Sequence, residues 1–301
     1  MIVRLPWHQT LLQGLGERKT NGGLPHALLI RVNSDSEAEA CGQALAQILL
    51  CERGEGCGSC PSCLRFAEGV HSDYLRLSPE QNSREIKVGQ VRELLAFGHQ
   101  TARYAFGKCI LITPADRLNR NAANALLKFL EEPPAESYLI LTTGRAGALP
   151  ATVQSRCQVS TVAKPSLNVA LEFLRDRGLS ESNLTEYLRL ASGDPLRVLA
   201  WESEGVLDEL HQISKEFGDL ITGGPSGSAD VHKRFERVPS TQLLDVLAVT
   251  LHEHARRSAE NNQLIGSVLK AHSELVELQR KHRASPNINI PLALEELCVN
   301  I

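Results

Sequence analysis

Residues 108–142, KCILITPADRLNRNAANALLKFLEEPPAESYLILT, decide the fold class. The apolar run at residues 108–113 predicts a buried strand, and a second strand is predicted at 137–142. Between them, residues 119–131 repeat apolar side chains at helical spacing. Two strands separated by a helix are typical of a parallel sheet whose faces are covered by helices.

The same alternation extends on both sides of this stretch. Further strands are predicted at 27–30, 73–77 and 159–162, and further helices at 36–50 and 88–102. Because strands and helices alternate along the chain, we expect residues 1–163 to form one α/β domain around a parallel sheet.

Strand signals end at Pro165. Residues 164–205 repeat leucine and aromatic side chains at helical spacing, which predicts a small helical domain. Longer helical patterns over residues 206–301 predict a third, all-helical unit. Within it, residues 222–228 are rich in glycine and serine and predict a flexible loop.

Composition limits the class of protein. The chain has 301 residues, 42% hydrophobic and 22% charged, which is typical of a soluble globular protein. Its 32 basic and 35 acidic residues leave a net charge of −3, which argues against binding nucleic acid through net charge alone. The first ten residues lack the pattern of an export signal, and no apolar run approaches the ~20 residues that span a bilayer. We therefore expect a cytoplasmic protein without a membrane segment.

Four of the eight cysteines crowd into one loop, at Cys51, Cys57, Cys60 and Cys63. In a reducing compartment such a cluster indicates a metal site before a disulfide. Four thiolates match tetrahedral zinc, and closed coordination makes such a metal structural rather than catalytic. Two alternatives stay open: Cys51 is a buried thiol at a helix end, or the other three cysteines form an incomplete site.

The strand at 27–30 ends where a nucleotide-binding protein would carry its phosphate loop. A Gly-x4-Gly-Lys-Ser/Thr motif beginning at Val32 would end in glycine, lysine and a hydroxyl residue, where this chain has Glu37, Ala38 and Glu39. Asp35, Glu37 and Glu39 would place carboxylates near the phosphates. We therefore expect no nucleotide-binding residues, and we interpret the acidic residues as the start of a helix, where the dipole favours them.

A second ATPase feature is also missing from the sequence. The strand at 108–113 should end in an Asp-Glu pair that holds magnesium, but the chain continues as Thr113-Pro114-Ala115-Asp116. Asp116 comes three positions late, and we expect it to be a surface or helix-capping residue. Hydrolysis by this chain alone lacks both essential elements.

Several segments of the chain resemble one known protein family. Residues 126–134, LLKFLEEPP, resemble the AAA+ clamp-loader subunits of bacterial DNA polymerase III, and so do the segments at 25–29, 71–74, 86–88, 141–143 and 155–157. The match covers about residues 1–200. Among the subunits with a cysteine loop, the altered phosphate loop makes the chain similar to the delta prime subunits, which have lost ATP binding, rather than to the gamma/tau ATPases.

The resemblance implies an architecture and partners. It implies a RecA-like AAA+ domain at residues 1–163 with a zinc loop at 51–63, a helical lid at 164–205 and a helical collar at 206–301. It implies no ATP bound by this chain, and a place beside the gamma/tau ATPase subunits and the delta subunit within the DNA polymerase III holoenzyme, which has nucleotidyltransferase activity. The whole complex would act on the sliding clamp and primed DNA.

The resemblance also assigns a role to Arg156 in Ser155-Arg156-Cys157. In this family the arginine of that motif projects into the ATP site of the adjacent subunit, where its fixed positive charge suits the transferring phosphate. The alternative is a local salt bridge. Thr143 and Arg197 resemble sensor positions of related ATPases, although a chain without nucleotide leaves them nothing to sense, and for Arg197 a salt bridge is the better expectation.

We therefore expect a clamp-loader subunit that does not hydrolyse ATP and that supplies Arg156 in trans. Two alternatives come from other classes of protein. One is an autonomous AAA+ ATPase with an unusual phosphate loop, and the other is a zinc-containing adaptor that binds nucleic acid.

Overall fold

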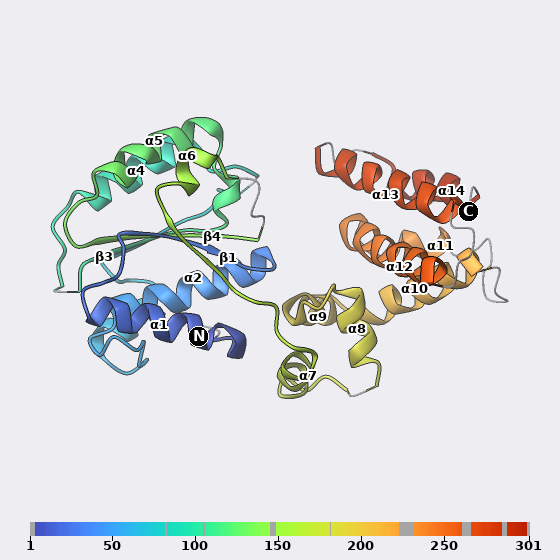
Figure 1. The fold of residues 1–301 in the computed structure, drawn as a ribbon, viewed down its shortest axis with the longest axis horizontal. Helices are drawn as coiled ribbons and strands as arrows, with labels where there is room; N and C mark the ends of the chain where they lie inside the picture. The colour runs from blue at the N-terminus through green and yellow to red at the C-terminus, as the bar shows by residue number, and fades with distance from the viewer. Residues whose placement is uncertain are drawn as a thin grey trace. The chain divides into compact units, whose positions relative to one another are not determined.

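The structure is a computed structural model, and it describes residues 4–81, 83–104, 106–144, 149–180, 182–222, 232–260, 266–284 and 288–299. The chain divides into two compact units, Met1–Pro165 and Ser166–Ile301 (Figure 1). We call them unit 1 and unit 2 and describe each by itself. The further division into a lid and a collar at residue 205 stays a prediction.

Unit 1 is built on a five-stranded parallel sheet with strand order β2-β3-β4-β1-β5. Its strands are β1 (Ala27–Arg31), β2 (Tyr74–Leu77), β3 (Lys108–Ile112), β4 (Ser137–Thr143) and β5 (Gln158–Thr161). Arg31 lies opposite Thr143, and Ile112 lies opposite Leu141. The carboxyl ends of β1, β3 and β4 therefore meet at one edge, which is where open α/β sheets place their ligands.

Helices cover both faces of this sheet. The helices α1 (Gln9–Thr20) and α2 (Asp35–Leu50) lie on one face, and α4 (Val88–Gly98) and α5 (Arg120–Glu131) lie on the other (Figure 1). In β1, Leu28 and Ile30 enter the core under α2, while Ala27 and Leu29 enter the core on the opposite face. Because both faces are buried, the strand needs an uninterrupted apolar run rather than an alternating one.

The fold class and the five expected strands are confirmed, and two helices of unit 1 differ from expectation. The helix expected to reach residue 102 ends at Gly98. Beyond it, the backbone N–H groups of Arg103 and Tyr104 donate to the carboxylate of Asp73 at 2.8–2.9 Å. The chain leaves the helix because these buried hydrogen bonds fix it beside β2. The helix α3 (Pro61–Ala67) was also not expected, and it begins within the predicted cysteine loop.

The N-terminal segment forms two elements that the sequence did not predict. These are a short 3-10 helix, η1 (Pro6–His8), and α1. Two glycines, Gly14 and Gly16, interrupt α1 and weaken its helical signal. Gly16 is needed for close packing, because a Cβ there would lie 3.0 Å from the carbonyl oxygen of Gly54.

Unit 2 is helical throughout its described residues. It contains α7 (Leu167–Arg175), α8 (Leu184–Leu190), α9 (Pro195–Ser203), α10 (Leu207–Thr222), α11 (His232–Phe235), α12 (Ser240–Glu260), α13 (Gly266–Ala284) and α14 (Ile290–Val299). Helix α12 packs against both α10 and α13. The flexible loop predicted at 222–228 begins at the last residue of α10, and its residues 223–228 lie outside the described residues. Among the helices that the structure describes, none has the length and apolar character needed to cross a bilayer.

Candidate functional site

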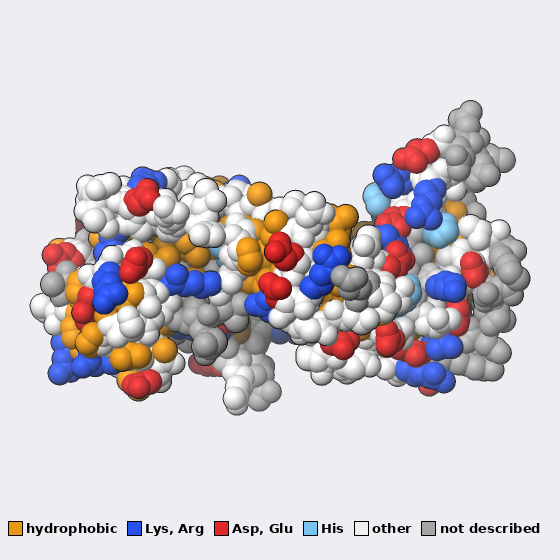
Figure 2. Space-filling view, turned by 90° about the horizontal axis from the view of Figure 1, so that it is seen from below, with side chains coloured by type: hydrophobic (Ala, Val, Ile, Leu, Met, Phe, Trp, Pro, Cys, Tyr) orange, Lys and Arg blue, Asp and Glu red, His pale blue; other side chains and the backbone are white. Residues whose placement is uncertain are grey.

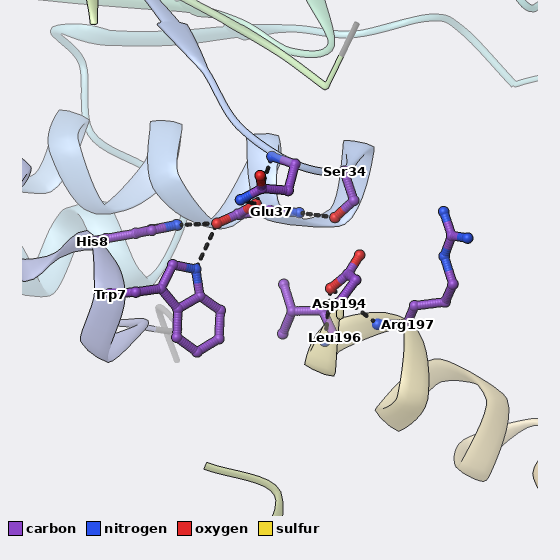
Figure 3. Close-up of polar contacts among 8 residues, drawn as sticks. Trp7, His8, Ser34, Glu37, Asp194, Leu196 and Arg197 are labelled. Carbon is purple, nitrogen blue, oxygen red and sulfur yellow. Dashed lines mark hydrogen bonds and ion pairs between the residues drawn. The ribbon is translucent and has the colours of Figure 1, made fainter. Parts of the chain in front are cut away.

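The loop between β1 and α2 stands where a nucleotide-binding fold carries its phosphate loop. Ser34 caps α2, and its hydroxyl accepts from the N–H of Glu37 at 3.3 Å. The Glu37 side chain is 2% exposed and folds back into unit 1 (Figure 3). One carboxylate oxygen accepts from the backbone and side-chain nitrogens of Asn33 at 2.7 and 2.8 Å. The other accepts from Nε2 of His8 at 2.8 Å and from Nε1 of Trp7 at 2.5 Å.

This burial corrects the sequence-based picture of Glu37. Glu37 lies in the first turn of α2, as expected from the sequence, but its carboxylate is an acceptor inside the protein rather than a surface charge at the helix start. Burial acts to raise the pKa of Glu37, and the hydrogen bonds from His8, Asn33 and Trp7 outweigh that effect and lower the pKa. An ionised carboxylate therefore occupies the backbone N–H of Asn33, which belongs to the loop that cradles phosphate in a nucleotide-binding protein.

The loop is also covered from the end of β4. A Cβ at Gly144 would lie 2.9 Å from the carbonyl carbon of Ser34 and 3.1 Å from the nitrogen of Asp35. Only a glycine allows the two backbones to approach so closely. The space above the loop is therefore reduced by the chain itself.

Asp116, which follows the strand where an ATPase would carry its acidic pair, belongs to a polar cluster at the same sheet edge. The hydroxyl of Thr143 donates to the Asp116 carboxylate at 2.8 Å. Arg117 lies 3.9 Å from Asp116 and 3.5 Å from Asp35, so its guanidinium bridges two carboxylates. The Asp116 side chain is only 2% exposed, so the expectation of a surface residue is wrong. The reason is that Asp116 lies on a 3-10 turn, residues 115–117, that points it toward Thr143 rather than into solvent.

Arg156 lies between the short helix α6 (Ala151–Gln154) and β5, and its side chain is 37% exposed. Its Nε and Nη2 lie 2.9 and 2.7 Å from the same carboxylate oxygen of Glu131. Its Nη1 donates to the carbonyl oxygen of Thr152 at 3.0 Å and approaches the hydroxyl of Ser155 at 3.4 Å. The local salt bridge left open by the sequence is therefore present in this chain, on a side chain that remains partly exposed.

Arg197 belongs to a salt bridge within unit 2. It starts in the first turn of α9, where the Asp194 side chain caps the helix by accepting from Leu196 and Arg197 (Figure 3). Its guanidinium lies 3.5 Å from Asp245 on α12. This contact matches the salt bridge expected from the sequence.

The four clustered cysteines come together in space. The Sγ atoms of Cys51, Cys57, Cys60 and Cys63 all lie within 4.8 Å of one another, and all four are free thiols. Zinc–sulfur bonds of about 2.3 Å would place tetrahedral sulfurs roughly 3.8 Å apart, so the donor set fits zinc with small movements. Gly56 and Gly58 have φ of 66° and 71°, a left-handed conformation that lets the loop turn around the cluster.

Backbone and hydroxyl donors surround these sulfurs. The N–H groups of Cys57, Cys60 and Cys63 each lie 3.3–3.4 Å from the sulfur of another cysteine in the cluster. Hydrogen bonds led by Ser59 lower the pKa of Cys57 to about 6. Such donors stabilise thiolates, which is the form that binds a metal.

A buried network ties the cysteine loop to the sheet. The Ser62 hydroxyl lies 2.5 Å from the carbonyl oxygen of Leu50, to which it donates, and 2.9 Å from Nε2 of His71. Nδ1 of His71 accepts from the N–H of Asp73 at 3.1 Å, just before β2. The loop is therefore attached at the end of α2 and at the start of β2, independently of any metal.

Sequence reasoning missed several residues of these sites. Trp7 and His8 bind Glu37, and they lie in an element that the sequence did not predict. No local signal pairs residues that are 29 and 30 positions apart. Glu131 lay inside the quoted 126–134 segment, but its contact with Arg156 depends on how α5 and α6 pack.

Fold and site together define a clamp-loader-type AAA+ domain, followed by a helical unit. A family model described as "DNA polymerase III, delta subunit" matches residues 7–166. The chain is 36% identical over 222 residues to the DNA polymerase III subunit delta' of Pseudomonas aeruginosa, and 35% identical over 224 residues to that of Escherichia coli. These alignments span 72% and 71% of this chain, and 66% and 67% of the two relatives. The chain belongs to the DNA polymerase III delta' subunit family.

Solved structures agree on the fold. A gamma subunit-related protein from Thermotoga maritima superposes with a TM-score of 0.55 at 20% identity, over 96% of this chain and 97% of that protein. At this identity the likeness concerns the fold alone. The delta' relatives and the parallel sheet confirm the expected family and fold class, and the chain is a clamp-loader component of the polymerase III type.

Proposed function

We propose that this chain is the nucleotide-free subunit of a bacterial clamp loader, and that it supplies Arg156 in trans to the ATP site of a neighbouring subunit. The observation that carries the first part is the buried carboxylate of Glu37 on the N–H of Asn33. A nucleotide phosphate would have to displace this carboxylate from its buried donors, and it would meet no lysine at position 38.

The residues at the same sheet edge also argue against ATP hydrolysis by this chain. Position 113, where an ATPase would carry a magnesium ligand, is a threonine, and the nearest carboxylate, Asp116, is held by Thr143 and Arg117. Phosphoryl transfer depends on positioned phosphates and a held metal ion. Neither requirement is met by these side chains, so this subunit does not turn over ATP itself.

The exposed part of Arg156 supports a role beyond this chain. A guanidinium is always charged and planar, which suits the developing charge of a transferring phosphate. An arginine supplied in trans raises the turnover of related nucleotide hydrolysis by about 10³–10⁵. The Glu131 salt bridge does not oppose this role, because it leaves the Arg156 side chain 37% exposed, and an exposed ion pair contributes only about 0–1 kcal/mol.

The partners follow from the family. Curated relatives include subunits named gamma and tau of DNA polymerase III, which are 29–31% identical to this chain over 139–153 residues. We propose that the chain docks in the cytoplasm beside ATPase subunits of that type and the delta subunit, and that the assembly places the sliding clamp on primed DNA. The helices of unit 2 after residue 205 would form the collar.

We further propose that Cys51, Cys57, Cys60 and Cys63 hold one zinc ion. A zinc ion bound by four thiolates has no open position for water, so it would cross-link the loop rather than act in a reaction. The cysteine residues set the ends of that loop, and Cys60 caps α3 through its sulfur. This is a structural role.

The two alternatives are disfavoured by particular residues. An autonomous ATPase would need the Asn33 N–H that Glu37 occupies. A nucleic-acid-binding adaptor would need a strongly basic surface, whereas basic and acidic side chains are interspersed on the face shown in Figure 2. Titration with ATP, and with DNA at two salt concentrations, separates these alternatives from a nucleotide-free subunit.

Reconstitution tests the proposal as a whole. Clamp loading onto primed DNA is measured with the cognate ATPase subunits and the delta subunit, with and without this chain. We expect assembly and loading only when the chain is present. Full loading without it, or saturable ATP binding by the isolated chain, would contradict the proposal.

A further inference from the structure

We propose that Glu131 is a positioning residue for Arg156, and that it holds the guanidinium in the orientation used in the neighbouring ATP site. This inference rests on the proposed trans role of Arg156 and assigns that site a second residue from this chain. The contact that motivates it is the carboxylate oxygen of Glu131 shared by Nε and Nη2 of Arg156.

The backbone that carries the Glu131 carboxylate is held in place by its neighbours in the chain. Glu131 is the last residue of α5, and the two residues before it, Phe129 and Leu130, are buried in the core of unit 1. The following residue, Glu132, closes the helix by donating its N–H to the carbonyl oxygen of Lys128 at 3.0 Å. The backbone of Glu131 is therefore rigid, although its side chain is 52% exposed.

The arginine is held on one edge and left open on the other. A guanidinium has five N–H donors. Nε donates to the Glu131 carboxylate, Nη2 lies 2.7 Å from the same oxygen as an ion pair, and Nη1 donates to the carbonyl oxygen of Thr152. Within the described residues, no other partner is recorded for Nη2. Its outward N–H can reach a phosphate while Nε stays on Glu131.

The location of this pair favours positioning over simple surface attraction. Glu131 lies at the carboxyl end of α5, where the helix dipole adds negative potential that favours a cation. Thr152 and Ser155 approach the guanidinium from α6 and its C-terminal end, and α6 packs on α5. The packed helices α5 and α6 thus both contact the flexible Arg156 side chain. Because these contacts already restrict its rotamers, less conformational entropy is lost when it meets the phosphate.

The test uses the complex reconstituted with cognate ATPase subunits, sliding clamp and primed DNA. ATP turnover is measured with the Glu131→Gln variant, the Arg156→Ala variant and the double variant. Glu132→Gln is the matched control, because it removes the same charge one residue further on, from an exposed side chain that contacts no arginine in the recorded salt bridges. Equal assembly of all variants is checked first by gel filtration.

We expect Glu131→Gln to lower kcat by about two- to fivefold, which corresponds to the up to about 1 kcal/mol of an exposed ion pair. The KM for ATP should not change, because the neighbour holds the nucleotide. In the Arg156→Ala background the same change should have no further effect on kcat. Glu132→Gln should behave as the unchanged chain does.

Each other outcome overturns the proposal in a recognisable way. If Arg156→Ala lowers turnover but Glu131→Gln matches the Glu132→Gln control or raises turnover, Glu131 is not a positioning residue, and the trans role of Arg156 stands. A further loss in the double variant would show that Glu131 acts independently of Arg156. Unchanged turnover with Arg156→Ala removes both proposals together.

Discussion

Nε2 of His8 lies 2.8 Å from the Glu37 carboxylate, and both side chains are buried. Because the ionised carboxylate can only accept, His8 donates from Nε2. The pair joins the N-terminal 3-10 turn to the first turn of α2, across the loop that a nucleotide would otherwise order.

Replacing this carboxylate should destabilise unit 1. In Glu37→Gln the side chain keeps its size, but an amide N–H group faces donors from Trp7, His8 or Asn33. Hydrogen bonds to a charged acceptor are worth more than neutral ones, so we expect a loss of about 2 kcal/mol in the free energy of unfolding at pH 7. Hydrogen exchange of the buried β1 amides measures it. A variant as stable as the unchanged chain would contradict the account of Glu37.

The Glu37→Gln variant should also change the pH dependence of stability. The pKa of Glu37 is lower in the folded chain than its ordinary value, so its contribution is complete above about pH 4.3 and is lost as the pH falls through the folded pKa. Glu37→Gln should therefore flatten the acid limb of the stability profile. Glu39→Gln is the control, because the Glu39 side chain is 36% exposed and its pair with Arg76 lies at the surface.

Thr143 and Asp116 should matter for stability and not for turnover. Thr143→Val removes the hydroxyl that donates to a carboxylate that is 2% exposed, which should cost about 1–3 kcal/mol. Urea unfolding measures this loss. ATP turnover of the reconstituted complex should stay unchanged, because the proposed function assigns no nucleotide to this subunit. A fall in turnover at unchanged assembly would instead assign the sensor position a function.

The cysteine cluster should bind about one zinc ion per chain. Cys60→Ser removes one of the four sulfurs but keeps a hydroxyl that can cap α3, so we expect loss of the metal and, because the loop is no longer cross-linked, faster amide exchange over residues 61–67. Cys157→Ser is the control, because that partly buried thiol lies outside the cluster and burial raises its pKa to about 12. Elemental analysis of the purified proteins measures zinc. Full zinc in Cys60→Ser, or none in the unchanged chain, would contradict the assignment.

The sheet of unit 1 could be predicted from local pattern. Each central strand is buried on both faces, so its signal is a continuous apolar run that does not depend on distant residues, as in residues 108–112. The helix α1 gave no such signal, because Gly14 and Gly16 lower its helix propensity, and Gly16 serves close packing on the cysteine loop. The end of α4 at Gly98 depends on Asp73, a residue 25 positions earlier in the chain.

The candidate sites also differ in whether their signal is local in the sequence or depends on distant residues. The crowding of four cysteines within residues 51–63 is local, and it is visible in the sequence. The altered phosphate loop is also local, but the burial of Glu37 is not, because two of its partners, Trp7 and His8, come from an N-terminal turn about thirty residues away. Glu131 and Arg156 are 25 positions apart and meet only because α5 and α6 pack together.

The most direct test of the central claim is ATP turnover, stimulated by sliding clamp and primed DNA, in complexes that contain either this chain or its Arg156→Ala variant at equal assembly. The account predicts that one nucleotide site of the neighbouring subunits loses its hydrolysis by a factor of about 10³ or more, while ATP binding there persists. Unchanged hydrolysis and clamp loading would contradict it and leave this chain without a part in the neighbour's reaction.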